Sequence, residues 1–99
     1  MRKLLAPVRT SGSWTLAEDG VPLWKGRYMQ LWHQRISPDG GRIAAVIAPS
    51  FGRWTVAVDD RPWDVTCRDM VDAPVFSPDG RRVAAAFKDG GRWTIAWSC

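Results

Sequence analysis

The chain has 99 residues, enough for one domain of modest size, and its 45% hydrophobic and 24% charged residues are typical of a folded globular protein rather than a disordered one. The formal net charge of +4 is spread along the chain without a run of like charges, which is more typical of a solvated surface than of the clustered footprint of a nucleic-acid-binding protein. The longest apolar stretches, such as residues 43–49, are too short to cross a bilayer. Residues 1–6 lack the sustained apolar core of a signal peptide. The sequence therefore predicts a cytoplasmic chain without a membrane span.

In chain order, the first predicted strand covers residues 13–17, Ser-Trp-Thr-Leu-Ala, and Glu-Asp-Gly at residues 18–20 predicts a hairpin turn after it. Ser-Pro-Asp-Gly at residues 37–40 predicts a tight reversal, because proline presets its φ angle and glycine accepts positive φ. Residues 43–47 are apolar on both alternating faces. That pattern predicts a strand that is covered on both sides.

A glycine-containing connection leads to the next predicted strand, which opens on Trp54. A turn at residues 59–61 follows, then a fourth strand at about residues 65–68 and the first strand of another unit at residues 74–76. The alanine-rich residues 83–87 are interpreted as a strand, because only about six to eight residues lie between turn signals, whereas globular helices average about eleven.

These elements belong to a repeated unit of about 40 residues, a period typical of propeller blades. Ser-Pro-Asp-Gly at residues 37–40 recurs at residues 77–80, and Gly-Arg-Trp-Thr at residues 52–55 recurs at residues 91–94. A partial earlier copy, Trp-Thr-Leu-Ala, precedes Trp-Thr-Val-Ala of residues 54–57 by 40 residues. The sequence therefore predicts an all-β fold of antiparallel four-stranded, propeller-type blades, with about nine strands in two and a fraction repeats.

We expect residues 1–99 to form a single partial-propeller domain, with repeat units at about residues 1–30 (partial), 31–70 (complete) and 71–99 (partial). The complete four-stranded unit covers about residues 31–67, preceded by the last two strands of one unit and followed by the first three of another. Because a blade cannot bury both faces alone, and because Trp97 lies in a strand with an unpaired edge, the sequence predicts a homo-oligomer that forms through open blade edges.

The stretches FSPDGRRVAAAFKDGGRWTIA and WTVAVDDRPW resemble the WD40-like or PD40 propeller repeats. More narrowly, they resemble the repeat of the D subunit (TmcD) of the transmembrane redox complex of sulfate-reducing bacteria, over nearly all of residues 14–97. The resemblance implies a soluble, cytoplasmic accessory subunit of an electron-transfer complex, with redox-complex subunits as protein partners and no cofactor of its own. The chain differs from that pattern in its length and at residues 97–98, where an acidic hairpin turn is expected.

No residue is predicted to be catalytic, to bind a cofactor or to hold a metal. His33 is the only histidine and has no nucleophile motif or second metal ligand near it in the sequence. Asp39 and Asp79 are interpreted as turn residues. Cys67 and Cys99 form no metal-binding pattern. A disulfide between them would need a short Cα separation, which the sequence does not establish, and we interpret both as reduced thiols.

The seven tryptophans divide into repeated and unrepeated positions. Trp54 and Trp93 recur at equivalent places, as do Trp24 and Trp63, and their repetition predicts interior packing. The candidate interaction surface is instead assembled from aromatic residues without a counterpart and the arginines near them: Arg27, Tyr28, Trp32, Arg35 and Trp97.

Two functional hypotheses follow. The first is a non-catalytic protein-interaction or scaffold module, an accessory subunit of an electron-transfer complex. The alternative is a binding module for nucleic acid or another anionic ligand, in which the mixed arginine and aromatic surface stacks single-stranded bases. An enzyme ranks behind both, because the sequence supplies no convergent titratable groups.

Overall fold

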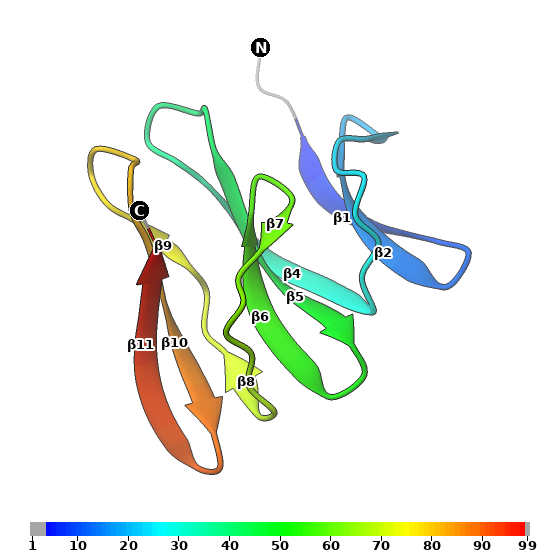
Figure 1. Ribbon diagram of the computed structural model, residues 1–99. Coiled ribbons are helices and arrows are strands. Elements are labelled where there is room, and N and C mark those ends of the chain that lie inside the picture. The colour runs from blue at the N-terminus through cyan, green and yellow to red at the C-terminus, as the bar shows by residue number, and fades with distance from the viewer. Residues whose placement is uncertain (1–3, 99) are drawn as a thin grey trace.

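The computed structural model describes residues 4–98, which form three antiparallel sheets. The sheets follow one another in chain order, each with its face toward the next (Figure 1). Sheet 1 comprises β1 (Leu5–Thr10), β2 (Ser13–Glu18) and β3 (Val21–Pro22); sheet 2 comprises β4 (Gln30–Ile36), β5 (Ile43–Ser50), β6 (Arg53–Val58) and β7 (Arg61–Pro62); sheet 3 comprises β8 (Met70–Val71), β9 (Val75–Phe76), β10 (Val83–Asp89) and β11 (Arg92–Ser98). The prediction of an all-β chain of antiparallel sheets is confirmed.

The strands of sheets 2 and 3 pair in matching registers. Ala45 of β5 lies opposite Ala57 of β6, and Ala85 of β10 lies opposite Ala96 of β11. The alanine-rich segment is therefore a strand, as predicted. Among residues 4–98 no helix has the length and apolar character that crossing a membrane requires.

The turn between β4 and β5 shows why Ser-Pro-Asp-Gly reverses the chain. The Ser37 hydroxyl donates to Asp39 Oδ1 at 2.7 Å, and the backbone N–H of Gly41 donates to the same oxygen at 2.9 Å. Gly40 has a φ of 79°, which a side chain would strain. The second copy repeats the arrangement, with Asp79 accepting from the Ser77 hydroxyl and from the N–H of Arg81. The predicted turn role of both aspartates is confirmed.

Two apolar cores hold the sheets together, one on each side of sheet 2. The first fills the space between sheets 1 and 2 and includes Leu16, Trp24, Leu31 and Ile47. The second lies between sheets 2 and 3, with Trp63 packed against it. Since Trp24 and Trp63 occupy successive cores, their predicted packing role is confirmed. The members of the second core are Ala44, Val46, Val56, Val58, Cys67, Val71, Val83, Ala85 and Phe87.

The predicted interior position of Trp93 is wrong. Trp54 is partly buried against the second core, whereas its repeat counterpart Trp93 is 50% exposed. The difference arises because β11 is the edge strand of sheet 3 and no other described strand packs on the face that carries Trp93.

Strand boundaries differ from the prediction in three places, one of which is β8, a short strand at residues 70–71 that pairs with β10 and was not predicted. β1 was not predicted, because Pro7 and the absence of a preceding turn motif obscure the strand pattern. The strand expected at residues 65–68 is reduced to a single bridge between Trp54 and Cys67, while β7 pairs with β6 at residues 61–62. Sheet 1 therefore has three described strands, where two were expected.

Candidate interaction site

A surface hollow on sheet 2 forms around a stacked pair of tryptophans. The rings of Trp32 on β4 and Trp54 on β6 lie 4.8 Å apart with an interplanar angle of 23°. Met29, Ala48 and Phe51 complete the apolar part of the hollow, which has a volume of about 440 Å³. We call this group the Trp32 hollow. An apolar depression with aromatic walls is the kind of surface that holds an anchoring side chain of a protein partner.

The residues of the Trp32 hollow are unusually accessible for their type. Phe51, at the tip of the turn between β5 and β6, is 91% exposed, and Met29 and Trp32 are 47% and 41% exposed. Trp54, on which Trp32 stacks, is only partly exposed. The pair of indole rings therefore has a covered side, formed by Trp54, and an open side, formed by Trp32. Large exposed aromatic groups that gather in one place mark contact surfaces more often than isolated ones do.

A β-bulge in β4 sets the position of Trp32. One extra residue lies between Trp32 and Arg35 relative to the paired segment of β5, and His33 within it has a φ of 55°. Such a bulge locally redirects side chains. Sheet 3 carries the same irregularity, since four residue steps from Val71 to Val75 lie opposite three on β10.

The structure removes Tyr28 from the candidate surface. Tyr28 is 6% exposed, and its hydroxyl donates to Asp60 Oδ1 at 2.7 Å. Burial, followed by the hydrogen bond and the charge of Asp60, raises the pKa of Tyr28 above its usual range. The bridges Trp14–Tyr28 and Trp54–Cys67 show that Tyr28 and Cys67 are repeat counterparts. This backbone position is interior in both copies.

Of the two arginines, Arg27 is held against sheet 1. Its guanidinium donates to Ser13 Oγ at 2.9 Å and to the Thr10 carbonyl. Arg35 is exposed on β4, where its guanidinium donates to the Gln34 carbonyl at 3.2 Å. With Tyr28 buried and Arg27 engaged, the five predicted residues do not form the mixed arginine and aromatic patch expected of them.

Trp97 lies apart from the Trp32 hollow, on the edge strand β11. It is 71% exposed and lines a second hollow of about 410 Å³ together with Trp63 and Val65. The side chains of Trp93 and Ile95 precede it at intervals of two residues, so the three share one face of the strand.

Asp60 is a structural residue that sequence reasoning missed. Its carboxylate accepts from the N–H of Lys25 at 2.9 Å and from that of Gly26 at 3.0 Å, in addition to the Tyr28 hydroxyl. It thereby ties the segment that follows sheet 1 to the β6–β7 turn of sheet 2. A Cβ atom at Gly26 would lie 2.3 Å from the Tyr28 hydroxyl, so only glycine fits there without a shift. Neither the long-range contact nor the need for glycine has a local sequence signal.

The sequence analysis did not identify Met29 and Phe51 as surface residues of the site, although the sequence around Phe51 differs from the repeat in a way that could have indicated it. It stands in the turn Ser-Phe-Gly, where the next copy has Asp-Gly-Gly. A bulky apolar residue at an exposed turn position is not needed for the turn itself.

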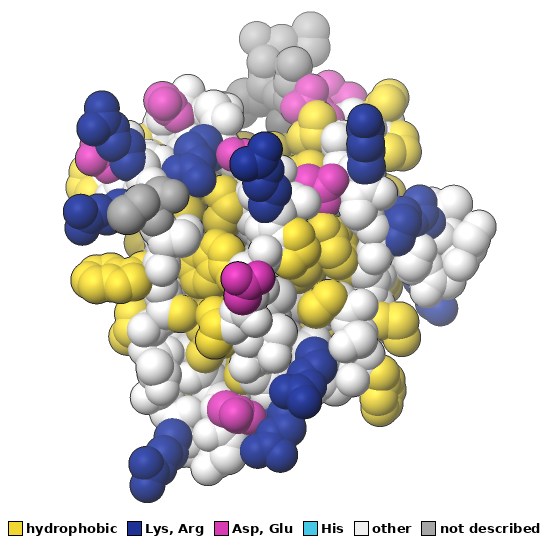
Figure 2. Space-filling view, in the orientation of Figure 1, with side chains coloured by type: hydrophobic (Ala, Val, Ile, Leu, Met, Phe, Trp, Pro, Cys, Tyr) yellow, Lys and Arg dark blue, Asp and Glu magenta, His cyan; other side chains and the backbone are white. Residues whose placement is uncertain are grey.

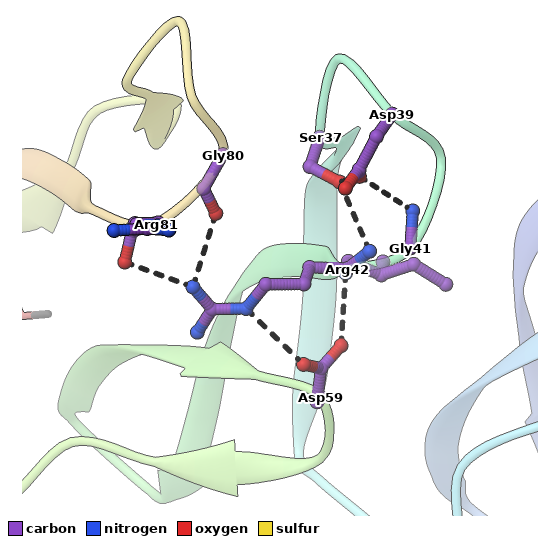
Figure 3. Close-up of polar contacts among 8 residues, drawn as sticks. Ser37, Asp39, Gly41, Arg42, Asp59, Gly80 and Arg81 are labelled. Atoms are coloured by element: carbon purple, nitrogen blue, oxygen red, sulfur yellow. Dashed lines mark hydrogen bonds and ion pairs between the residues drawn. The ribbon is translucent and has the colours of Figure 1, made fainter.

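A polar hollow of about 710 Å³ lies between the two Ser-Pro-Asp-Gly turns. Figure 3 shows Arg42 reaching from one turn to the other, where its Nη1 donates to the carbonyls of Gly80 at 3.1 Å and Arg81 at 3.0 Å. On its other side, Arg42 Nε lies 3.4 Å from Asp59 Oδ2. These bonds join sheets 2 and 3, so the arginine is engaged in structure.

The shifted carboxyl pKa values have structural causes. The Ser37 hydroxyl, and after it the Gly41 N–H, lower the pKa of Asp39, and the Ser77 hydroxyl with the Arg81 N–H does the same for Asp79. The Arg68 side chain lowers the pKa of Asp89 in the same way. Within residues 4–98, no group of three or more His, Cys, Asp or Glu side chains is placed to hold a metal ion.

Comparisons with protein-family models, with curated proteins and with solved structures give no match for this chain.

Proposed function

We propose that this chain is a non-catalytic protein-interaction module built from propeller-type blades, and that it serves as an accessory subunit of an electron-transfer complex. The Trp32 hollow is the contact surface. The stacked Trp32–Trp54 pair beneath the exposed Phe51 is the observation that carries the proposal. The electron-transfer context comes from the resemblance of the repeat to that of the D subunit of the transmembrane redox complex.

The distribution of charge favours a protein partner over a nucleic acid. Figure 2 shows Lys and Arg side chains scattered over one face of the molecule, with hydrophobic side chains gathered between them. Binding to a phosphate backbone requires several basic groups along one track. Arg27 and Arg42 already donate to backbone carbonyls within the chain. The anionic-ligand alternative therefore has less support.

The shifted titratable groups also favour a non-catalytic role. Tyr28 is held in a buried hydrogen bond, and the lowered carboxyl pKa values belong to groups in turn or surface ion-pair contacts. A catalytic site brings such groups together in one cavity. Here Asp39 and Asp79 both line the polar hollow between the two turns, but the carboxylate of each accepts hydrogen bonds within its own turn. Tyr28 and Asp89 are not among the residues that line this hollow.

Substituting Trp32 by alanine tests the contact surface. With a purified transmembrane redox complex prepared without its D subunit, we expect the 99-residue chain to bind and the Trp32→Ala variant to bind at least about tenfold more weakly, because an aromatic anchor is lost. Ile36→Ala is the matched control, since Ile36 lies on the same strand and is 50% exposed. Biolayer interferometry measures both affinities.

Two results contradict the proposal. One is that the unaltered chain fails to bind the complex while its melting curve shows a folded protein. The other is retention on a single-stranded oligonucleotide that falls steeply between low and moderate salt, since that behaviour identifies the anionic-ligand alternative.

A further inference from the structure

We infer that the partner segment that enters the Trp32 hollow is acidic, a stretch of polypeptide in which apolar anchoring side chains are flanked by Asp and Glu residues. The inference rests on the proposed function, because it gives the chemistry of the partner at the contact surface named there. Two observations carry it. The hollow is apolar at a place where the fold accepts charged residues, and the turns beside the hollow are basic.

The Trp32 hollow belongs to the sheet that has a neighbour on each face. Sheet 2 packs on sheet 1 through one apolar core and on sheet 3 through the other. Met29, Trp32 and Phe51 of sheet 2 and its adjoining residues are nevertheless exposed. Their exposure is therefore not that of an uncovered outer sheet.

Backbone hydrogen bonds identify the residues of sheet 3 that correspond to those of the hollow. The N–H of Met29 donates to the Ala48 carbonyl at 2.8 Å, and the N–H of Asp69 donates to the Lys88 carbonyl at 3.3 Å. Asp69 and Lys88 are therefore the counterparts of Met29 and Ala48. Two charged residues in sheet 3 take the places of two apolar residues that line the hollow in sheet 2.

The same comparison places a carboxylate where Trp32 stands. Leu31 of β4 and Val71 of β8 pair with corresponding residues of β5 and β10. The residues that follow them, Trp32 and Asp72, are therefore counterparts as well. Sheet 3 forms the same strand pairing with charged residues at these places, so the fold does not require the apolar ones of sheet 2. Apolar side chains that are exposed without serving the fold indicate a contact surface.

The hollow lies at the end of sheet 2 that carries the β5–β6 turn. The equivalent turns of the three sheets lie in a row along one side of the molecule, from the β1–β2 turn at the right to the β10–β11 turn at the bottom (Figure 1). We call the surface made by these turns, by the two strand residues on each side of them and by the side chains bonded to them the basic end. Its charged residues are Arg9, Arg27, Arg53, Arg68, Lys88 and Arg92, with Asp69 and Asp89.

The basic end has arginines that are available to a partner. Arg9, Arg53 and Arg92 are exposed, and within residues 4–98 no hydrogen bond or ion pair joins their side chains to another residue. Arg53 directly follows Gly52, which lines the Trp32 hollow. No residue that lines the hollow is charged. An uncharged apolar hollow beside a free guanidinium complements a segment with an apolar centre and acidic flanks.

The opposite ends of the sheets do not share this charge. Their turns mix both signs and give an acidic segment no comparable attraction. The charged residues in and beside these turns include Asp19, Asp39, Asp59, Asp60 and Asp79, with Arg42, Arg61, Arg81 and Arg82.

The composition of the hollow favours a polypeptide over a nucleic acid. The aliphatic and thioether groups of Ala48 and Met29 lie around the Trp32 indole, whose ring stacks on Trp54. A phosphate backbone needs several basic groups along one track, whereas Asp89 interrupts the basic residues here. The volume of about 440 Å³ lies in the range of about 300–1,000 Å³ that is typical of sites holding several groups of one ligand. Two or three apolar side chains of a partner segment suit such a space.

Three fluorescein-labelled peptides of about twelve residues test the inference without the redox complex. The first carries two leucines and a phenylalanine between aspartates and glutamates. The second carries the same apolar residues between lysines, and the third keeps the acidic residues but has serines in place of the apolar ones. We expect fluorescence anisotropy to give the first peptide at least about tenfold higher affinity than either of the others, because it alone matches both the hollow and the basic end.

Substitutions in the chain then locate the contact. Arg53→Glu reverses the charge beside the hollow and should weaken binding of the first peptide by about tenfold. Arg61→Glu is the matched control, since Arg61 is an exposed arginine at the opposite end, and its effect should stay below about twofold. Trp32→Asp gives sheet 2 the residue type that sheet 3 carries there, so the variant should fold and lose at least about tenfold in affinity. If thermal unfolding shows that it does not fold, Met29→Asp takes its place, because Asp69 stands at that position in sheet 3.

Several results would overturn the inference. Equal affinities for the acidic and lysine peptides, or no binding of any peptide at about 1 mM, would exclude an acidic partner segment. Equal affinities for the first and third peptides, or no effect of Trp32→Asp, would show that the hollow is not the contact. Tighter binding of a single-stranded oligonucleotide than of the first peptide would identify a nucleic-acid site instead.

These failures differ from a failure of the proposed function. The proposed function fails when the folded chain does not bind the redox complex, which the peptides do not test. If the chain binds the complex through Trp32 but Arg53→Glu leaves that affinity unchanged, the proposed function stands and the acidic partner segment is excluded.

Discussion

Replacing Leu16 by alanine should lower the free energy of unfolding by about 2–5 kcal/mol, the range for removing a fully buried leucine. Leu16 on β2 is 0% exposed and lies in the core between sheets 1 and 2, with Trp24 and Leu31 around it. The substitution leaves a cavity in the core that joins the two sheets. Urea denaturation of the dilute chain measures the change.

Ile95→Ala is the matched control for Leu16→Ala. The repeat places Leu16, Val56 and Ile95 at one position in three successive sheets. Ile95 is 63% exposed in the single chain, so its truncation should change stability by no more than about 0.5 kcal/mol at concentrations where the chain is monomeric. Equal losses for the two variants would contradict the assignment of Leu16 to an inter-sheet core.

Asp60→Ala should destabilise the chain by about 3 kcal/mol. The change removes the acceptor for the N–H groups of Lys25 and Gly26 and leaves the buried Tyr28 hydroxyl without its partner. It also places alanine at a φ of 66°, where a side chain is disfavoured. Thermal and urea unfolding measure the loss.

Asp60→Gly separates the two contributions, because glycine accepts positive φ but supplies no carboxylate. We expect it to recover about 1 kcal/mol relative to Asp60→Ala. Gly26→Ala attacks the same cluster from the other side, since its Cβ would lie 2.5 Å from Asp60 Oδ1. Wild-type stability for all three variants would show that this cluster does not join sheets 1 and 2.

The cluster also has a pH signature. Burial and Asp60 raise the folded-state pKa of Tyr28 above the usual value near 10. A raised folded-state pKa gives stability that is complete below pH 10 and is lost as the pH rises through the range between the two values. The alkaline loss should therefore be smaller in Tyr28→Phe, which has no phenol to ionise.

Local chemistry explains how much of the fold was predictable. Ser37, Asp39 and Gly40 specify their turn within a few residues, so the sequence indicates it directly. The alternation of apolar residues in β5 likewise reports a strand with both faces covered, as the two cores confirm. The repeat period of about 40 residues and the turn-forming residues together predict the positions of most of the strands.

Exposure was less predictable, because it depends on sheets that are distant in the sequence. Trp54 and Trp93 share a repeat position, yet one is partly covered by sheet 3 and the other lies on an open face. Tyr28 looked unrepeated because its counterpart, Cys67, is not aromatic. Its burial depends on Asp60, 32 residues away, whose role no local pattern indicates.

The candidate site was only partly predictable for the same reason. Trp32 was identified because it has no aromatic counterpart in the next unit. Its ring stacks on that of Trp54, and the two rings together line the Trp32 hollow. Met29 directly precedes the first residue of β4, and Phe51 directly follows the last residue of β5. Only the pairing of β4 with β5 brings them together.

The central claim is that two segments about 40 residues apart form the same antiparallel pairing. Cross-strand backbone nuclear Overhauser effects test it most directly. We expect contacts between Ala45 and Ala57 and, in the same register, between Ala85 and Ala96. Helical contacts between residues three apart along 83–87, or different strand partners in the two copies, would contradict it.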